Sequence, residues 1–486
     1  MRKRVKVFYV LLVVFVLTIL ILLVKTFMFT SQQPVAFSVE RKSIDTQDLE
    51  SLSELLKLET IASSDRKSED SSDFDLVLPW IRNNYPLISS NCDIQIINNS
   101  GVLIKVEGKD SGLSPDLLAA HIDVVPIPEN QLELWNKSPY GGEYDSEFVY
   151  GRGTLDDKGS AFAILEAVEE LLKNNGKPIR TTYLAFGFDE ETGGTNGAMA
   201  IAKYFSDSGI KLNMALDEGS VVTKGIVPGL AKNAAIIGIA EKGYVTFKLE
   251  SVAEAGHSSM PARDNAVNKL VEVLEKIRKE PFKARLSKPL KAFIQYLGPE
   301  MPFPEKMVFA NTWLFDDLLI STYEAIPSGN AMVRTTSAVT IIDAGVKDNV
   351  VPSSASATIN FRILPGDNID AIEKYLKHVI GESDVRLTRY DEFAKEPSKV
   401  SSHESDSYQR VASVIAGTFD NTVVVPGLVI AGTDGRHYES IAENVYRFSP
   451  FVLESEDLER IHGNNERISI ENLNSAKTFF YNLLIN

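Results

Sequence analysis

Thiols are scarce in this chain of 486 residues and Lys and Arg are outnumbered by Asp and Glu, 50 to 66; both facts narrow its chemistry. The single cysteine, Cys92, excludes an internal disulfide and a zinc site made of thiolates, so any metal site must be built from His, Asp and Glu. The formal charge of −16 argues against nucleic acid as a partner, because binding to a phosphate backbone needs clustered Lys and Arg. With 44% hydrophobic and 24% charged residues, the composition is that of a globular protein.

Hydrophobic runs of membrane-spanning length are also rare, and the only one is the uncharged stretch from Val7 to Val24. As a helix it would extend about 27 Å, close to the roughly 30 Å of a bilayer's hydrocarbon core. Basic residues precede it, which favours a signal-anchor transmembrane segment over residues 1–30, with the rest of the chain outside the cytoplasm. The compartment would be the periplasm, a vacuole or the cell exterior. The alternative is a cleaved signal peptide and a secreted protein.

Apolar runs alternate with helical periods after about residue 94. The segments 117–124, 183–188 and 213–216 are typical of buried strands, whereas 161–172 and 198–205 have the apolar spacing of helices. This alternation predicts an α/β fold with a mostly parallel sheet. In such sheets ligands gather at the carboxyl ends of the strands, so the residues that follow each strand are the first to inspect for function.

The pattern changes twice, which predicts one domain inserted in another. Residues 31–242 are expected to form the first part of a catalytic domain, beginning with a polar stalk over 31–45, and residues 394–486 its second part. Residues 243–393, with alternating strands and two helical periods, are expected to form a smaller α+β lid. Within the lid, the stretch 283–340 has no clear pattern.

Two motifs near the predicted strand ends combine residue types that bind metals. His121 and Asp123 are two residues apart, and on a strand they would share a face, so that one can bind a metal while the other orients it. Asp156 and Asp157 lie between glycines directly before a predicted helix. A helix N-cap accounts for one of these carboxylates but not comfortably for both.

Three further motifs extend the set, namely Asp189-Glu190-Glu191, Asp217-Glu218 and His462. Adjacent carboxylates repel each other, and at the end of an apolar strand a multivalent cation is the simplest way to hold them. Histidine and carboxylate ligands suit zinc without thiolates. A bridging carboxylate with ligands on either side would make a two-metal site, which can acidify a water molecule and polarise an amide carbonyl. An unligated carboxylate must then carry the proton to the leaving amine, so the double Glu supplies one ligand and one base.

The order of these motifs resembles that of the M20 metallopeptidase family, above all the branch with carboxypeptidase S and N-fatty-acyl-amino-acid synthase/hydrolase. The resemblance extends from about residue 45 to the C-terminus. It implies two zinc ions per chain bridged by Asp156, with Glu190 as the general base and Asp123 positioning His121. The implied zinc ligands are His121, Asp156, Glu191, either Asp217 or Glu218, and His462. The choice between Asp217 and Glu218 stays open.

Motifs in the predicted lid and after it resemble the same family. The segment around His257 resembles the one whose histidine stabilises a developing oxyanion. Asn349 and Arg362 lie in segments that resemble those recognising the substrate carboxylate, a task that suits the planar fork of Arg. Gly432 and Thr433 belong to the last matching block and are expected to line the substrate site. Without the resemblance, His257 would be interpreted as a capping residue and Arg362 as part of a surface ion pair.

The predicted function is hydrolysis of an amide bond next to a free carboxylate, as in a carboxypeptidase or dipeptidase acting on small peptides. The alternatives are an N-acyl-amino-acid amidohydrolase, with fatty-acyl substrates among its targets, and a metal-stabilised binding protein without activity. The presence of both Glu190 and His257 argues against the binding protein. The chain is expected to be a monomer or a homodimer. Many M20 relatives pair their lids so that the lid histidine enters the partner's site, whereas the long 283–340 stretch would suit a monomer.

Overall fold

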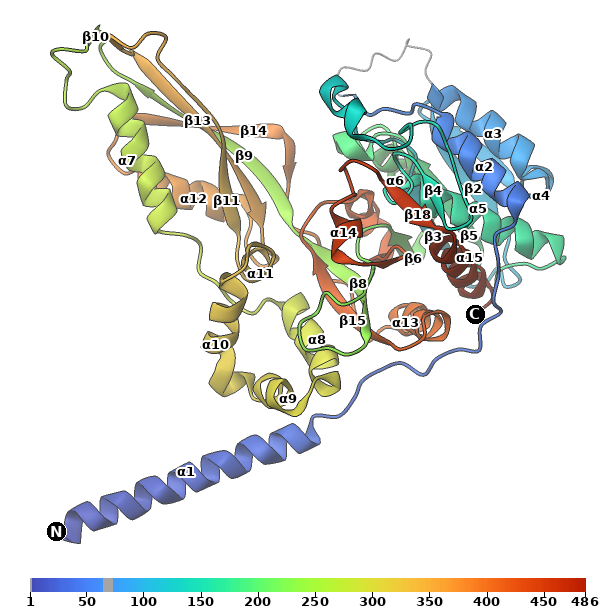
Figure 1. Cartoon of the computed structure of the whole chain (residues 1–486), viewed down its shortest axis with the longest axis horizontal. Coiled ribbons are helices and arrows are strands. Elements are labelled where there is room, and N and C mark those ends of the chain that lie inside the picture. The colour runs from blue at the N-terminus through green and yellow to red at the C-terminus, as the bar shows by residue number, and fades with distance from the viewer. Residues whose placement is uncertain (1, 64–72) are drawn as a thin grey trace.

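A mixed sheet of ten strands forms the centre of the main body in the computed structural model, which describes residues 2–63 and 73–486 (Figure 1). The strand order is β1-β2-β5-β3-β6-β16-β8-β7-β17, and β15 pairs with β8. The strands are β1 (Asp93–Ile97), β2 (Gly101–Val106), β3 (Asp116–His121), β5 (Thr182–Gly187), β6 (Leu212–Asp217), β7 (Val222–Thr223), β8 (Asn233–Glu241), β15 (Thr422–Val429), β16 (Ala442–Arg447) and β17 (Val452–Leu453).

The centre of this sheet, from β5 through β3 and β6 to β16, is parallel, but β1, β2 and the β16–β8 contact are antiparallel. The prediction of a mostly parallel sheet is therefore corrected to a mixed one. The physical reason lies in the turn between β1 and β2. Asn98 and Asn99 both have positive φ, at 50° and 77°, and such a turn reverses the chain into a hairpin. The turn makes β1 antiparallel to β2, and β2 in turn pairs antiparallel with β5.

Helices cover both faces of the sheet, so its central strands are apolar on both sides. On β5, Leu184 and Phe186 belong to the core shared with α5 and α15, whereas Tyr183 and Ala185 belong to the core shared with α6. The helices on these faces are α2 (Thr46–Lys57), α5 (Lys158–Lys173), α6 (Ala198–Asp207), α13 (Asp406–Thr418) and α15 (Ile470–Ile485). Burial on both faces explains why these strands read as continuous hydrophobic runs.

A second sheet of four antiparallel strands, ordered β11-β13-β9-β14, extends from the main body at the left of Figure 1. Its strands are β9 (Gly243–Val252), β11 (Thr336–Ala344), β13 (Ser354–Ile363) and β14 (Val385–Lys395). Helices α7 (Ala266–Lys279) and α12 (Ile369–Ile380) share its hydrophobic core. We call this unit the lid sheet. Two short strands, β10 (Gly256–His257) and β12 (Val350–Val351), pair at its far tip.

The stretch 283–340, which showed no clear sequence pattern, is mostly helical. It contains α8 (Lys288–Leu297), α9 (Phe303–Ala310), α10 (Thr312–Glu324) and α11 (Pro327–Val333), and it leads into β11. Leu290 and Phe293 of α8 are buried in the core of the main body, where α8 lies against β15. This part of the inserted segment thus packs on the main body rather than on the lid sheet.

The N-terminal helix α1 (Arg2–Met28) projects away from the rest of the chain (Figure 1). By length and composition it is able to cross a membrane. The residues that follow do not form the free stalk predicted over 31–45. Gln33 exchanges two hydrogen bonds with Val424, and the backbone N–H groups of Glu40, Lys42 and Ile44 donate to side chains of α15. Because polar side chains of α15 satisfy this backbone, the segment lies along the main body.

The remaining helices and strands are short. They are α3 (Val77–Asn84), α4 (Pro86–Asn91), α14 (Ser455–Leu458), β4 (Phe148–Tyr150) and β18 (Arg467–Ser469).

Candidate active site

Three strand ends and two loops meet at one edge of the main sheet. β3 ends at His121, β5 at Gly187 and β6 at Asp217, and because these strands are parallel neighbours their carboxyl ends lie together. The loop before α5 brings Asp156 to this edge, and the turn before β18 brings His462.

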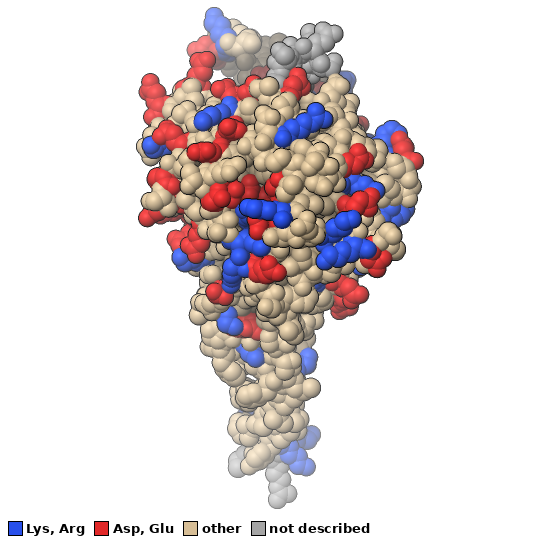
Figure 2. All heavy atoms as spheres, turned by 90° about the vertical axis from the view of Figure 1, so that its right-hand side faces the viewer, with Lys and Arg blue, Asp and Glu red and all other residues tan. Residues whose placement is uncertain are grey.

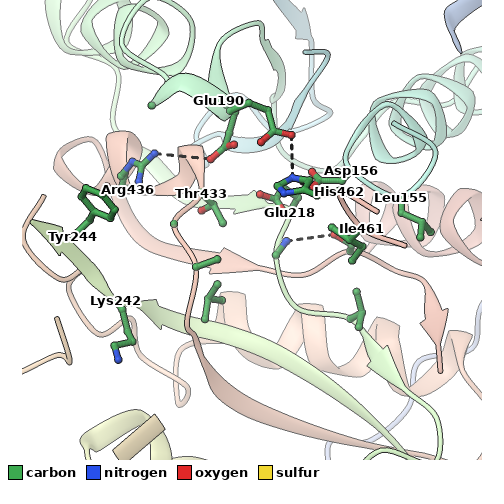
Figure 3. Close-up of a pocket in the computed structure, with 18 of the residues that line it drawn as sticks. Leu155, Asp156, Glu190, Glu218, Lys242, Tyr244, Thr433, Arg436, Ile461 and His462 are labelled. Atoms are coloured by element: carbon green, nitrogen blue, oxygen red, sulfur yellow. Dashed lines mark hydrogen bonds and ion pairs between the residues drawn. The ribbon is translucent and has the colours of Figure 1, made fainter. Parts of the chain in front are cut away.

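Five side chains at this edge form two groups that share Asp156, and Figure 3 shows three of them, Asp156, Glu218 and His462, close together. His121, Asp156 and Glu218 make one group, and Asp156, Glu191 and His462 make the other; in each, the potential ligand atoms lie within 4.8 Å of one another. His121 Nε2 is 2.8 Å from Asp156 Oδ1, whereas His462 Nε2 is 3.0 Å from Asp156 Oδ2. The shared carboxylate thus has a histidine and a Glu on each side. This donor set, without a thiol, fits two divalent cations of the zinc type.

Asp123 lies behind His121 and is fully buried. The predicted strand 117–124 ends at His121, so the expectation that the two side chains share a strand face is wrong. Instead, the Asp123 carboxylate accepts hydrogen bonds from the backbone N–H groups of Glu190 and Glu191, at 3.2 and 3.1 Å. His121 Nδ1 lies 3.0 Å from the Asp123 carbonyl oxygen and 3.4 Å from its carboxylate. These contacts orient the imidazole and leave Nε2 directed at Asp156.

Negative charge accumulates at this edge and changes the titration of its members. Burial raises the pKa of Glu218 well above its usual range, and the negative charge of the neighbouring carboxylates, Asp156 first among them, raises it further. Burial raises the pKa of Glu190 in the same way. Hydrogen bonds to Asp156 and Glu191 raise the pKa of His462 to about 10. Buried carboxylates in such number require compensating positive charge, which bound divalent cations would supply.

The structure separates the two members of the Asp217-Glu218 pair. Asp217 is the last residue of β6, and its carboxylate accepts the backbone N–H groups of Gly435 and Glu218. Glu218 extends beyond the strand and joins His121 and Asp156. Asp217 therefore holds the loop that carries Thr433, whereas Glu218 faces the cluster.

A cavity of about 760 Å³ opens next to the cluster. Asp156, Glu190, Glu191, Glu218 and His462 line one side of it, and Gly432 and Thr433 line it as well. Another part of the lining is cationic, with Arg362 and Lys395 from the root of the lid sheet and Arg436 from the main body. Figure 3 shows Glu190 directed toward Arg436, whose guanidinium nitrogen Nη2 is 3.9 Å from Glu190 Oε1. The cavity thus has an acidic end suited to metals and a basic end suited to an anion.

The structure does not bring His257 and Asn349 to this cavity. His257 pairs with Val350 at the far tip of the lid sheet, where both His257 and Asn349 are exposed (Figure 1). The Nδ1 atom of His257 lies 2.8 Å from the Ser259 hydroxyl. His257 is therefore neither a helix-capping residue nor part of the site of its own chain.

Sequence reasoning missed several residues that shape the site. Tyr244 lines the cavity, and the Arg362 guanidinium lies 4.8 Å above its ring; the two residues face each other in the β9–β13 register. Glu466 is buried and accepts hydrogen bonds from Arg152 and from the backbone of the loop before Asp156. The sequence held one signal for this pair, since Arg152 and Glu466 each lie four residues from a predicted ligand, Asp156 and His462 respectively. Tyr244 had no such signal, because only strand pairing brings it opposite Arg362.

Comparison with known proteins assigns the chain to one family. The model of peptidase family M20/M25/M40 matches residues 117–486. The chain is 38% identical to probable carboxypeptidase S-like 2 of Dictyostelium discoideum, over 96% of this chain and 92% of that protein. It is 36% identical to the N-fatty-acyl-amino acid synthase/hydrolase of Xenopus tropicalis, over 92% of this chain and 86% of the other. An M20 family metallo-carboxypeptidase from Sulfolobus solfataricus shares the fold, with a TM-score of 0.66, 17% identity, and coverage of 90% of this chain and 98% of that one. The chain belongs to peptidase family M20/M25/M40 and is an enzyme of its metallopeptidase and amidohydrolase type.

Proposed function

We propose that the protein is a two-zinc hydrolase that cleaves an amide bond next to a free carboxylate, acting as a carboxypeptidase or dipeptidase on small peptides. One observation carries the proposal: the cavity joins a histidine–carboxylate cluster to a cationic end formed by Arg362, Lys395 and Arg436. A substrate with a carboxylate one residue from its scissile amide would meet both ends at once.

The proposed ligands are His121, Asp156, Glu191, Glu218 and His462, with Asp156 bridging the two ions. When bound, zinc would supply Lewis-acid polarisation of the amide carbonyl and a lowered pKa for the attacking water. The side chain of Asp217 is not proposed as a ligand, because its oxygens are engaged by backbone N–H groups.

Glu190 is the proposed general base. It lines the cavity beside the cluster without belonging to either ligand group, and its nearest charged partner is Arg436 at 3.9 Å. Its carboxylate is therefore placed to take a proton from water and donate it to the leaving amine. Asp123 supports this role, since it accepts the Glu190 N–H and thereby positions the turn. Arg362 is proposed to hold the substrate carboxylate, with Gly432 and Thr433 lining the space between.

A second substrate class is favoured by the apolar part of the cavity. Val221, Phe393, Phe451, Leu453 and Ile461 line it together with the charged groups. A long acyl chain would bury these side chains, and one of the chain's relatives is named for N-fatty-acyl amino acids. Hydrolysis of an N-acyl amino acid uses the same carboxylate recognition and the same amide chemistry.

We further propose that α1 anchors the protein in a membrane with the catalytic part outside the cytoplasm, in the periplasm, a vacuole or the cell exterior. The length and apolar composition of α1 support this, and basic residues precede its apolar run. The protein would act as a monomer or a homodimer. Because His257 and Asn349 lie outside the cavity of their own chain, roles for them in oxyanion and carboxylate binding require a second copy or a movement of the lid.

The test uses the full chain in detergent, with metal content measured by elemental analysis and hydrolysis measured on blocked dipeptides, N-acyl amino acids and their carboxyl-amidated forms. We expect two zinc ions per chain and activity only on substrates with a free carboxylate. Glu190→Gln should keep both metals and lose activity by on the order of 100- to 10,000-fold. Arg362→Met should raise KM for free-carboxylate substrates. A folded protein without metal, or equal turnover of the amidated substrates, would contradict the proposal.

A further inference from the structure

Exposed apolar side chains lie on the inserted helices α9 and α10 and at the start of α11, outside the catalytic cavity. Its members are between 46% and 54% exposed: Phe303, Trp313, Leu314, Leu318 and Ile326. We call these five residues the apolar ridge. Large apolar side chains gathered on a surface usually mark a contact with another molecule or with a membrane.

The apolar ridge is continuous with the end of α1. The rings of Phe303 and Phe27 lie 6.4 Å apart, and the ammonium of Lys25 lies 5.5 Å from the ring of Trp313. Asn311, between α9 and α10, is buried and donates hydrogen bonds to the Leu22 carbonyl and the Thr26 hydroxyl. The two inserted helices are thus fastened to the last turns of the helix that is able to cross a membrane.

The packing between these parts leaves no room for a side chain at one point. A Cβ on Gly298, in the turn between α8 and α9, would lie 2.4 Å from the ring of Phe29. The end of α1 therefore contacts both ends of α9, and the position of the apolar ridge relative to α1 is set by direct contacts. Figure 1 shows α9 and α10 gathered at the C-terminal end of α1. In Figure 2, which faces the right-hand side of Figure 1, charged side chains cover the main body, whereas the tapering lower end is mostly uncharged above its basic tip.

The amino-acid composition of the apolar ridge favours a lipid bilayer as its partner. An indole beside apolar side chains is typical of the membrane–water interface, where its apolar body and polar N–H are both accommodated. Residues 307–333 contain no Lys, Arg or His, and the acidic residues Asp316, Asp317 and Glu324 lie among them. The nearest basic residues, Lys25 and Lys306, are few beside these carboxylates, so insertion would rest mainly on apolar burial and not on attraction to anionic headgroups.

We propose that the apolar ridge docks on the bilayer surface and inserts its side chains beside the outer end of α1. The inference rests on the proposed anchoring by α1 and adds a second, interfacial contact. It would hold the main body against the membrane instead of leaving it to swing on a single helix.

The experiment uses the full chain reconstituted in phosphatidylcholine vesicles. A single cysteine is introduced at Leu314→Cys in a Cys92→Ser background and labelled with an environment-sensitive fluorophore. Met199→Cys on α6 is the matched control, because Met199 is 45% exposed and Leu314 is 46% exposed. Both variants are first checked for wild-type thermal unfolding.

We expect the label at position 314 to shift to the blue and to lose about half or more of its emission when the acyl chains carry bromine, while the label at 199 changes little. The quenching should be equal in phosphatidylcholine and phosphatidylserine vesicles. Flotation with the vesicles but no quenching at 314 would overturn the docking and leave the anchor intact. Loss of flotation would overturn the anchor itself, and docking with it. If the blue shift at position 314 grows with protein density but brominated lipid does not quench the label, the ridge contacts a second copy of the chain and the proposal is refuted. Quenching that requires phosphatidylserine would refute the apolar mode.

Discussion

Removing the buried carboxylate of Glu466 should destabilise the protein and disturb its metal cluster together. The side chains of Glu466 and Arg152 are 0% and 3% exposed, and their ion pair is 2.7 Å long. Glu466 also accepts the backbone N–H groups of Gly153 and Leu155, at 3.0 and 2.8 Å, while Arg152 donates to the carbonyl of His462. The pair thus joins the loop that carries Asp156 to the turn that carries His462.

The size of this destabilisation follows from the three contacts of Glu466, namely its ion pair with Arg152 and the hydrogen bonds from the two backbone N–H groups. Breaking a buried ion pair by removing one partner costs about 3–5 kcal/mol, because the other charge stays buried without compensation. The orphaned N–H groups add to this, since each buried donor without an acceptor costs about 1–3 kcal/mol. We expect Glu466→Ala to lower the free energy of unfolding by at least about 4 kcal/mol. Glu466→Gln keeps an acceptor for the two N–H groups but faces Arg152 with an amide, so about half of that loss is expected.

The assay is denaturant unfolding, with and without a chelator, combined with zinc analysis. The matched control is Asp207→Ala, which removes an ion pair between Lys203 and Asp207 whose side chains are 73% and 64% exposed, and which should cost less than about 1 kcal/mol. The double variant Arg152→Met/Glu466→Met should be more stable than Glu466→Ala, because no unpaired charge remains. If Glu466→Ala and Asp207→Ala have equal effects, the reasoning about the buried pair is refuted.

Three further outcomes are expected. Glu218→Gln should bind fewer than two zinc ions per chain, whereas Asp217→Asn should still bind two; the reverse pattern in elemental analysis would exchange their roles. Burial and the Arg436 guanidinium lower the pKa of His437 to about 4, below its unfolded value, so the stability it contributes is present above about pH 6.5 and is lost as the pH falls toward 4. Between pH 7 and 5 the wild type should therefore lose about 2 kcal/mol that His437→Gln retains, and identical losses in both proteins would contradict this assignment. Chelation should lower the unfolding temperature and added zinc should restore it, because each occupied site stabilises the folded state by about 4 kcal/mol at a thousandfold excess of zinc over Kd. An unchanged temperature would argue against a metal cluster.

Local patterns predicted most of the elements, because helix and strand periods depend on neighbours within a few residues. The helix expected over 161–172 lies within α5 (Lys158–Lys173), and the helix expected over 198–205 lies within α6 (Ala198–Asp207). α8 shows where the same reasoning fell short. Its buried residues Leu290, Phe293 and Leu297 have helical spacing, but the signal is short and lies among irregular segments.

The residue types of the site were also determined by the sequence alone. With a single cysteine, a metal cluster had to use His121, His462 and carboxylates, and the positions of His121, Glu191 and Glu218 at the ends of apolar strands directed these three to one sheet edge. The resemblance of the ordered motifs to the M20 family followed from the same residues, and the family match confirms it.

Only the tertiary structure decided which role each of these residues has in the site. Asp217 and Glu218 are adjacent in the chain, but β6 ends between them, so one binds backbone N–H groups and the other faces Asp156. Strand register brought Tyr244 opposite Arg362, and the length of the lid sheet carried His257 away from the cavity. Sequence patterns carry information about periods of two to four residues, whereas these contacts join residues between 62 and 218 positions apart, from Asp156 and Glu218 to Asp217 and Gly435. Their geometry depends on how whole sheets and helices pack, and that is why it emerged only with the fold.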